Sequence, residues 1–388
     1  MAAGTNNMIS VYSKKYHRIG VAAFFFVFGF CFASWASRIP AIQQKTGLTE
    51  TELGLLLFSL PVGLFISLPL SGWLVAKKGS KLVVCVAAII YSSVLVSLGF
   101  AGNKFQLSAA LFCFGLGGNM GNIAVNTQAV NVEAMYERNI MASFHGVWSL
   151  AGFTGAAFGT LMTSLSLAPK QHFLVVFAIA ILIFIVASRF LVTNDIKSAE
   201  SAPLFAWPDK SLLILGLIAF SSMICEGAMF DWSGVYFKKV VMAKPSLVGA
   251  GYTAFMGTMA LSRFVADHFT HRFGFKKIVQ SSGIIITTGL LLAVIFPHFY
   301  TAIAGFLLVG IGVSSIVPLV YSAAGKSKHL SPGIALASVS TISFFGFLIG
   351  PPLIGLLAGI SDLRLSFSVI ACMGLCVTIF GSLVKEKY

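Results

Sequence analysis

Residues 211–236 read SLLILGLIAFSSMICEGAMFDWSGVY, a stretch of 26 residues without lysine or arginine. A helix of this length is about 39 Å long, which is enough to cross the roughly 30 Å hydrocarbon core of a bilayer. Its two carboxylates, Glu226 and Asp231, are costly in hydrocarbon and are functional candidates by default. The stretch therefore predicts a membrane-spanning helix that carries chemistry.

Eleven further apolar runs of similar length occupy most of the remaining chain. In the 388 residues, 57% are hydrophobic, 10% are charged, and 36 Phe stand against 12 Asp plus Glu, a composition that a soluble core could not use. The sequence predicts an all-α integral membrane protein with twelve transmembrane helices. We expect the spans near 18–37, 50–76, 81–101, 105–132, 141–166, 171–193, 211–236, 246–268, 277–297, 299–322, 333–359 and 363–384, with bends at Pro61, Pro69, Pro318, Pro351 and Pro352.

Lysine and arginine are distributed unequally between the two sets of loops. Seventeen fall on the side of the N-terminus and eight on the opposite side, with Arg263 inside a span. The positive-inside rule therefore predicts that both termini are cytoplasmic. Because the basic residues that give the net charge of +14 sit in short loops between spans, we expect no nucleic-acid partner. All six cysteines fall in apolar spans without a Cys/His cluster, so we expect no metal site.

The two halves of the chain share a pattern of glycines. The longest polar stretch between spans lies at the centre and predicts a linker, 194–210, between six-helix bundles at 1–193 and 211–388. Shifting the sequence by 195 residues superimposes five pairs of glycines, more than glycine content alone predicts. The pairs are Gly54 and Gly249, Gly79 and Gly274, Gly115 and Gly310, Gly117 and Gly312, and Gly155 and Gly350.

A glycine turn inside a basic cluster occupies equivalent places in the halves: AKKGSKL at 76–82 and HRFGFKK at 271–277. With twelve spans and a central linker, the chain resembles the major facilitator superfamily, whose signature reads G-x-x-x-D-R-x-G-R-R. The residues that fit are Gly72, Lys77, Gly79 and Lys81 in the first half and Arg272, Gly274 and Lys276 in the second. Ala76 and His271 replace the signature acid, although Asp267 lies one turn earlier, so the charge relay with which the family latches its inner gate is incomplete here.

Two further stretches look like the bacterial fucose-permease-related branch of that superfamily. They are GNIAVNTQAVNVE at 121–133, followed by SFHG at 143–146, and EGAMFDWS at 226–233. The resemblance implies two pseudo-symmetric bundles that rock about a midplane site and move a small polar solute, commonly a sugar, together with a proton. It also implies a monomer in the bacterial cytoplasmic membrane, with the solute and the bilayer as partners and no cofactor.

The fourth expected helix (helix 4, from the span near 105–132) carries a narrow polar stripe. Asn119, Asn122, Asn126 and Glu133 lie within about 60° on one face of this helix. Because an amide both donates and accepts hydrogen bonds, the asparagines suit a hydroxyl-rich solute, with Glu133 as a gate at the inner mouth. Hydrogen bonding between helices is the alternative for each asparagine.

Glu226 and Asp231 are the candidates for proton coupling. They lie five residues apart and therefore point about 140° away from each other. A carboxylate in a low-dielectric cavity binds a proton more readily, and we expect Glu226 to be the proton site. A paired structural acid is the alternative.

Arg38 ends the first span at the outer level. Helices 1 and 7 face each other in the resembled fold, so Arg38 could pair with Asp231 or Glu226 when the outer side closes. A snorkelling arginine and an anion-binding arginine are the alternatives.

Helices 5 and 8 pack together in the resembled fold. They carry His145 and Arg263, with Asp267 one turn after Arg263. We expect a gate between these residues, with a packing role for His145 as the alternative.

Three tryptophans are candidates for stacking on a sugar ring. They are Trp35, Trp148 and Trp232, and interface anchoring explains Trp35 and Trp232 equally well. Proton-driven efflux of an amphipathic compound is the alternative to uptake. An enzyme is not expected, because no HExxH or G-x-S-x-G pattern is present, and doubled halves argue against a ring-lined channel.

Overall fold

The computed structural model describes residues 13–136, 140–193, 195, 210–325 and 332–384. These residues form helices and short turns, and no strand occurs among them. Ten helices in this part are long and apolar enough to cross a membrane. Two further helices, α7 (Met141–Ser164) and α10 (Ala250–Phe273), have 24 residues each but contain more small, hydroxyl or charged side chains. The segments Glu50–Lys78 and Phe299–Ala324 are each broken into two helices but count as one span. With the two helices of 24 residues, the described spans give the twelve passes that the sequence predicts.

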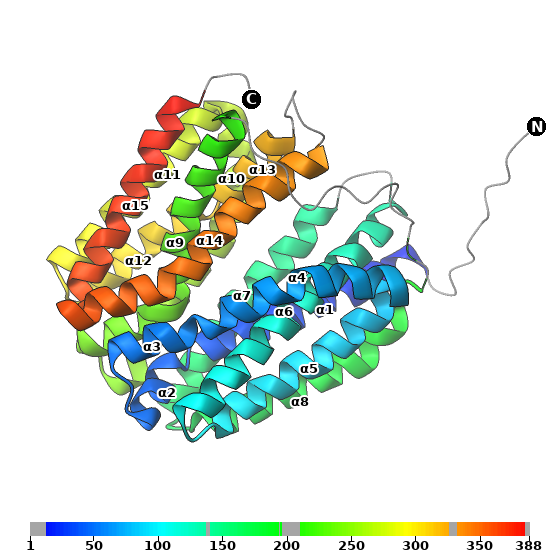
Figure 1. The fold of residues 1–388 in the computed structure, drawn as a ribbon, viewed down its shortest axis with the longest axis horizontal. Coiled ribbons are helices and arrows are strands. Elements are labelled where there is room, and N and C mark those ends of the chain that lie inside the picture. The colour runs from blue at the N-terminus through cyan, green and yellow to red at the C-terminus, as the bar shows by residue number, and fades with distance from the viewer. Residues whose placement is uncertain (1–12, 137–139, 194, 196–209, 326–331, 385–388) are drawn as a thin grey trace, which may run out of the picture.

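Each half of the chain builds its own bundle (Figure 1). The first bundle contains α1 (Lys14–Ala36), α2 (Ile39–Thr46), α3 (Glu50–Leu57), α4 (Ser59–Lys78), α5 (Ser80–Phe100), α6 (Lys104–Glu133), α7 and α8 (Pro169–Ala187). The second contains α9 (Lys210–Lys239), α10, α11 (Phe275–Ile295), α12 (Phe299–Val313), α13 (Ile316–Gly325), α14 (Pro332–Ile360) and α15 (Leu363–Leu383). The short helix α2 was not expected from the sequence. Of the predicted linker, only Asp195 and Lys210 are among the described residues.

Two of the expected prolines break their helices. Pro61 has no N–H to donate to the Leu57 carbonyl, and α3 ends at Leu57 while α4 begins at Ser59. Pro318 likewise has no N–H to donate to the carbonyl of Ser314, which lies in the gap between α12 and α13. Pro69, Pro351 and Pro352 instead lie inside continuous helices, α4 and α14.

The same close helix contact occurs in both bundles, 195 residues apart. A Cβ added to Gly115 on α6 would lie 1.9 Å from the Leu60 carbonyl oxygen on α4. A Cβ added to Gly310 on α12 would lie 2.4 Å from the Phe255 carbonyl oxygen on α10. Only glycine allows such an approach of two backbones. The repeated glycines are therefore contact points of the same packing arrangement.

The contacts between the bundles are also repeated. A Cβ on Gly54 of α3 would lie 2.9 Å from the Gly355 Cα of α14, and a Cβ on Gly249 would lie 2.3 Å from Thr160 Oγ1 of α7. Residues 54 and 249, and residues 160 and 355, are each 195 apart. Exchanging the halves exchanges these two contacts, which describes a pseudo-two-fold relation between the bundles.

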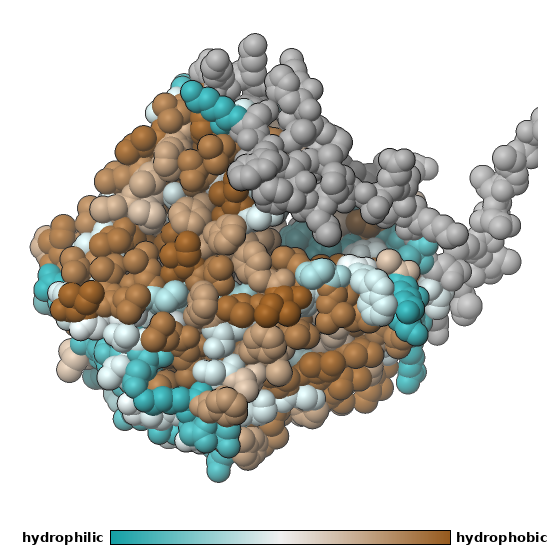
Figure 2. All heavy atoms as spheres, viewed as in Figure 1, coloured by the Kyte–Doolittle hydropathy of each residue, from teal (hydrophilic) through white to brown (hydrophobic). Residues whose placement is uncertain are grey.

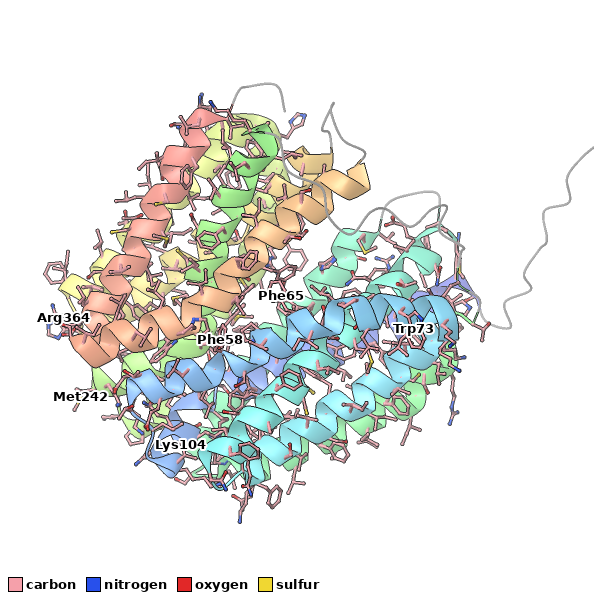
Figure 3. All side chains as sticks on the ribbon, in the orientation of Figure 1. Phe58, Phe65, Trp73, Lys104, Met242 and Arg364 are labelled. Carbon is pink, nitrogen blue, oxygen red and sulfur yellow. The ribbon has the colours of Figure 1, made fainter. Side chains whose placement is uncertain are left out.

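The two ends of the molecule differ in how the bundles meet. We call the end with Gly79, Gly274 and Asp195 the linker end, and the end with α2 and Lys104 the far end. At the far end the bundles touch, whereas toward the linker end α13 and α14 diverge from α4 (Figure 1). Phe65, which lies between the bundles in Figure 3, contacts Phe345 of α14 with ring centroids 5.7 Å apart.

The flanks of the bundles are apolar. In Figure 2, hydrophobic residues cover most of the visible sides, and hydrophilic residues gather toward the ends. On α8, Leu182 and Val186 are 65% and 61% exposed. Such a surface is stable against lipid tails and would be a liability in water.

Candidate functional site

Arg263 connects the two bundles. This residue lies on α10, and its Nη1 donates a 2.6 Å hydrogen bond to Ser149 Oγ on α7 of the other bundle. Its Nη2 lies 3.7 Å from Glu226 Oε1 on α9, within its own bundle. Glu226, Arg263 and Ser149 therefore form a polar chain that crosses the boundary between the halves.

Small residues bring α7 and α10 close enough for this chain. A Cβ on Gly152 would lie 2.3 Å from Met256 Cε, and a Cβ on Gly257 would lie 3.1 Å from Phe153. Closer to the linker end, Gly146 faces Phe264 at 3.4 Å. The contact follows α7 on both sides of Ser149, as the resemblance implied for helices 5 and 8.

The members of the chain differ in accessibility. The Glu226 side chain is 8% exposed and that of Arg263 is 21% exposed, so the guanidinium is the more accessible partner. Arg263 Nε is buried and finds no hydrogen-bond acceptor among the described residues. An arginine has five N–H donors. Much of the donor capacity of Arg263 is therefore unused.

Further titratable groups surround this pair. Tyr252 of α10 lies within electrostatic range of both Glu226 and Asp231, and its buried hydroxyl has no partner in the described part. Asp231 itself is half-buried. His145 is exposed, and its ring lies edge-on to Phe25 at 5.5 Å. The side chain of Asp267 is outside the described part, so its predicted gating role stays a prediction.

The helix 4 stripe lies on α6. Asn122 is exposed, and Asn126 Nδ2 donates to Asn122 Oδ1 at 3.0 Å and to its carbonyl at 2.8 Å. Asn119 is 4% exposed and its Nδ2 is buried without a partner among the described residues. Neighbouring asparagines thus use part of their hydrogen-bonding capacity on each other. Solute binding by this stripe stays a prediction.

The three tryptophans differ in burial. Trp35 and Trp232 are 1% and 0% exposed, and neither indole N–H has a partner in the described part. They pack inside the protein here, which is not the position of an interface anchor. Trp148 is half-buried, at the contact between α1 and α7.

Arg38 lies at the expected end of the first span but has different partners from those expected. Although the far ends of the bundles touch, its guanidinium donates within its own bundle, to Thr163 Oγ1 in the last turn of α7 and to the carbonyl of Leu167, just after this helix. The carbonyl end of a helix attracts a cation, which explains this position. Burial lowers the pKa of Arg38 to about 10, which still leaves it charged at neutral pH.

Glu133 also has a local role. Its Oε2 accepts hydrogen bonds of 2.7 Å from the backbone N–H groups of Ile140 and Met141, at the start of α7. A carboxylate at a helix N-terminus satisfies free donors and the helix dipole. Its use as a gate stays a prediction.

The loop-motif glycines have nearly the same backbone conformation. Gly79 has φ of 83° and Gly274 has φ of 81°, a region that favours glycine. Each ends one helix and starts the next. The basic residues beside them lie over aromatic rings: Lys77 Nζ is 4.7 Å from the Trp73 ring and the Arg272 guanidinium is 5.5 Å from the Phe273 ring. Gly72 is exposed on α4, and Lys81 is half-buried on α5.

Asp195 supplies an acid beside this loop that the signature comparison missed. It accepts from Ser80 N at 2.6 Å, from the Ser80 hydroxyl, and from Asn131 Nδ2 at 2.7 Å. Gln128 Nε2 completes the group by donating to Ser80 Oγ at 2.7 Å. An acid distant in sequence therefore caps α5. Asp195 lies in the predicted linker and outside any motif, so no sequence pattern identified its role.

Polar contacts across the far end were missed as well. Lys239 of α9 pairs with Glu50 of α3, and Lys238 Nζ donates to Gln44 Oε1 at 2.6 Å. These contacts join the bundles where they touch. Basic and acidic residues at helix ends are common, so the sequence alone did not single them out.

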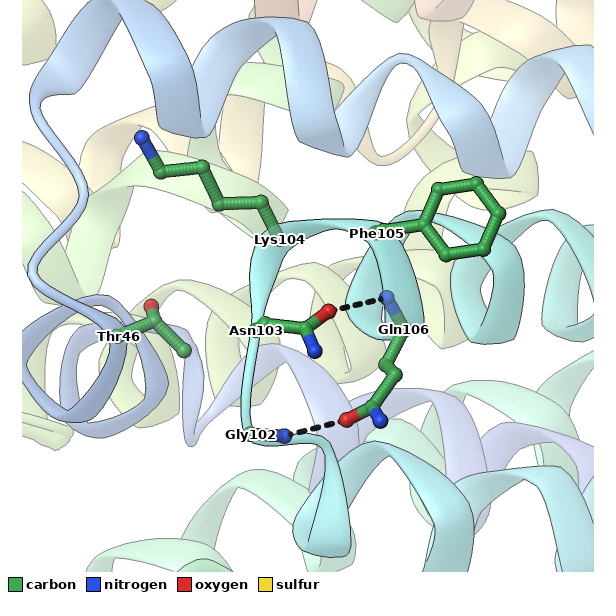
Figure 4. A pocket seen from close by; sticks show the side chains of 6 residues that line it. All are labelled: Thr46, Gly102, Asn103, Lys104, Phe105 and Gln106. Atoms are coloured by element: carbon green, nitrogen blue, oxygen red, sulfur yellow. Dashed lines mark hydrogen bonds between the residues drawn. The ribbon is translucent and has the colours of Figure 1, made fainter.

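A shallow depression lies at the far end of the molecule. It is lined by Thr46, Gly102, Asn103, Lys104, Phe105 and Gln106 (Figure 4). Asn103 Oδ1 accepts from Gln106 N, and Gln106 Oε1 accepts from Gly102 N, both at 2.9 Å. These polar groups are used to cap α6.

Comparison with known proteins places this architecture in a family. The model of the Major Facilitator Superfamily matches residues 19–243 and 212–387. The chain belongs to the Major Facilitator Superfamily. An uncharacterized MFS-type transporter of Yersinia pestis is 31% identical over 353 residues, which cover 91% of this chain and 92% of the relative. An uncharacterized transporter of Sinorhizobium fredii is 33% identical over 371 residues, which cover 95% and 98%.

A solved structure with the same fold agrees with this membership of the Major Facilitator Superfamily. A bacterial homologue of the human lysosomal transporter Spinster, in an inward-facing and occupied conformation, has a TM-score of 0.75 at 15% identity and covers 97% of this chain and 98% of its own. The protein is a multi-pass membrane protein and a secondary transporter, not an enzyme. Its place in the fucose-permease-related branch stays a prediction.

Proposed function

We propose that the protein takes up a small polar solute across the bacterial cytoplasmic membrane, together with a proton, by alternating access. The observation that carries this proposal is the chain from Glu226 through Arg263 to Ser149, because it joins a carboxylate to the boundary between the bundles. A transporter needs such a link if the protonation of one side chain is to change the arrangement of two bundles.

The coupling step follows from the charges. Ionised Glu226 is the nearest counter-ion of Arg263 in the described part, and both side chains are largely removed from water. A proton on Glu226 leaves the guanidinium without a counter-charge, which is costly in a low-dielectric site. Arg263 must then take another partner or move. Because Arg263 also holds Ser149, either change alters the contact between α10 and α7.

The solute site in this proposal lies between the bundles, near α6 and α7. The exposed amide of Asn122 would be costly against lipid, so we infer that it faces the space between the bundles. His145 is exposed one turn before Ser149 on α7 and is assigned to the same space. Asn122, Asn126, His145 and the half-buried Trp148 offer donors, acceptors and an aromatic face to a polar solute.

The linker end is assigned to the cytoplasm. The loops at this end hold most of the lysines and arginines, as the positive-inside rule requires of cytoplasmic loops. The bundles touch at the opposite end through Lys239 with Glu50 and Lys238 with Gln44. The described conformation is then closed to the outside, and these pairs form an outer gate that separates when the solute enters.

The test uses purified protein in lipid vesicles, with a solute found by thermal-shift screening of sugars, organic acids, peptides and nucleosides. The wild type should accumulate this solute when a proton gradient is imposed. Glu226→Gln should lose accumulation and keep exchange of internal for external solute, because exchange needs no net proton movement. Glu52→Gln, at an acid that is exposed at the far end and pairs with Lys104, is the matched control and should behave as wild type. Accumulation by Glu226→Gln at the wild-type level would refute the assignment of the proton site.

A further inference from the structure

The guanidinium of Arg263 is partly exposed and only partly hydrogen-bonded within the described part of the chain. Among the described residues it makes one hydrogen bond, to Ser149, and the nearest described carboxylate oxygen, Glu226 Oε1, is 3.7 Å away, beyond hydrogen-bond distance. Its Nε–H is buried without an acceptor among the described residues. A buried N–H without an acceptor is unfavourable, because it loses the hydrogen bond that water would give it. Arg263 is therefore held in place but incompletely satisfied.

The accessible partner of the ion pair is the cation. The Arg263 side chain is 21% exposed and that of Glu226 is 8% exposed. A solute that approaches the pair therefore meets the guanidinium rather than the carboxylate. His145, which is exposed and lies within electrostatic range of Arg263, adds a ring nitrogen on the α7 side. The accessible groups here favour a ligand with acceptor oxygens.

We propose that the transported solute carries a carboxylate that binds Arg263 in place of ionised Glu226. A guanidinium presents parallel N–H donors that match the two oxygens of a carboxylate, and Glu226 does not use this arrangement in the described conformation. This inference rests on the proposed function, because it names the class of solute for the same site.

Charge balance then links the solute to the proton. Arg263 in a low-dielectric site requires one negative partner, and two carboxylates beside it would repel each other. Binding of the anionic solute therefore favours the protonated form of Glu226, and a proton on Glu226 favours binding of the anion. Among the described side chains, the other ionisable groups around the pair are Cys225 and Asp231 on α9, Tyr252 on α10, Tyr321 on α13 and His145 on α7. One proton and one carboxylate enter together, and the charge of the site is unchanged.

The experiment compares acids with their neutral counterparts. Purified protein is titrated with D-gluconate and D-glucose, D-galacturonate and D-galactose, and L-lactate and L-lactamide, and thermal stabilisation gives the apparent affinity. At least one acid should stabilise the wild type, more strongly at low pH, and its neutral counterpart should not. Glu226→Gln mimics the protonated acid and should bind this acid tightly at every pH.

Variants of Arg263 separate binding from folding. Arg263→Gln should weaken binding of the acid by roughly 10- to 100-fold, the loss expected for a charged hydrogen bond. Arg263→Lys keeps the charge and should restore part of the affinity. Because Arg263→Gln leaves Glu226 without its counter-ion, the double variant Glu226→Gln with Arg263→Gln serves as a neutral pair that should fold and still fail to bind.

Three results of these titrations would overturn the inference: equal stabilisation by acids and neutral counterparts, full stabilisation by an acid in Arg263→Gln and the double variant, or no stabilisation by any acid. Proton-coupled accumulation of a neutral solute would overturn it and leave the proposed function intact. Failure of Glu226→Gln to alter coupling would instead refute the proton site of the proposed function.

Discussion

Alanine at Gly115 should destabilise the protein by forcing α6 away from α4. The added Cβ would lie 1.9 Å from the Leu60 carbonyl oxygen, whereas ordinary contacts between these atoms exceed 3 Å, so the helices must separate by about 1 Å. Overpacking of this kind costs about 1–3 kcal/mol. At about 2–4 °C per kcal/mol, a value for domains of 150–250 residues, Tm should fall by several degrees. Gly310→Ala, at the equivalent contact of the second bundle, should lower Tm similarly.

Gly72→Ala is the matched control. Gly72 lies on the same helix, α4, and a Cβ there would meet no atom within 4 Å. Alanine in a helix is favoured over glycine by about 1 kcal/mol, so Tm should stay constant or rise slightly. Thermal unfolding in detergent, monitored by tryptophan fluorescence, gives the Tm of Gly115→Ala, Gly310→Ala and Gly72→Ala. Gly115→Ala with wild-type Tm would refute the backbone contact, and a similar fall for Gly72→Ala would show that the effect is not specific to it.

Three further predictions concern the two ends of the molecule and its buried arginine. Asp195→Ala removes the cap of α5 and should cost about 0.5–2 kcal/mol, measured as a lower Tm, with Asp195→Asn showing a smaller loss; unchanged Tm in both would contradict the cap. Glu50→Gln breaks the contact with Lys239 and should increase labelling of cysteines introduced at the far end, while Glu52→Gln should not; equal labelling would count against an outer gate. Arg38→Met should lower Tm, because the Leu167 carbonyl loses its charged donor and an unsatisfied buried group costs about 1–3 kcal/mol. A rise in Tm would show that the cost of desolvating the guanidinium outweighs its hydrogen bonds.

The spans and the repeat were predictable because they follow from composition and spacing. Long apolar runs set the helices, and the offset of 195 residues located Gly115 and Gly310 before their contacts were known. Proline effects were predictable only in part. Pro61 and Pro318 lie at helix breaks, whereas Pro69 lies within a continuous helix. The sequence does not say whether neighbouring helices can satisfy the backbone groups that a proline releases.

Contacts between distant helices were not predictable from one sequence. Periodicity identifies a polar face but not its partner. Arg38 was expected to pair with a carboxylate of α9, but it donates to groups at and just after the end of α7. The chain from Glu226 through Arg263 to Ser149 joins three helices. The sequence singled out Glu226 and Arg263 separately, but neither their proximity nor Ser149. Asp195 was missed because an acid in a linker carries no signal of its own.

The number of protons that enter with each solute molecule decides whether Glu226 carries the coupled proton. Vesicles containing a pH-sensitive dye and purified protein receive the identified solute, and the initial rates of solute entry and internal acidification are compared. We expect one proton per solute for wild type and for Glu52→Gln, and none for Glu226→Gln, which should still exchange solute across the membrane. One proton per solute in Glu226→Gln would contradict this role of Glu226.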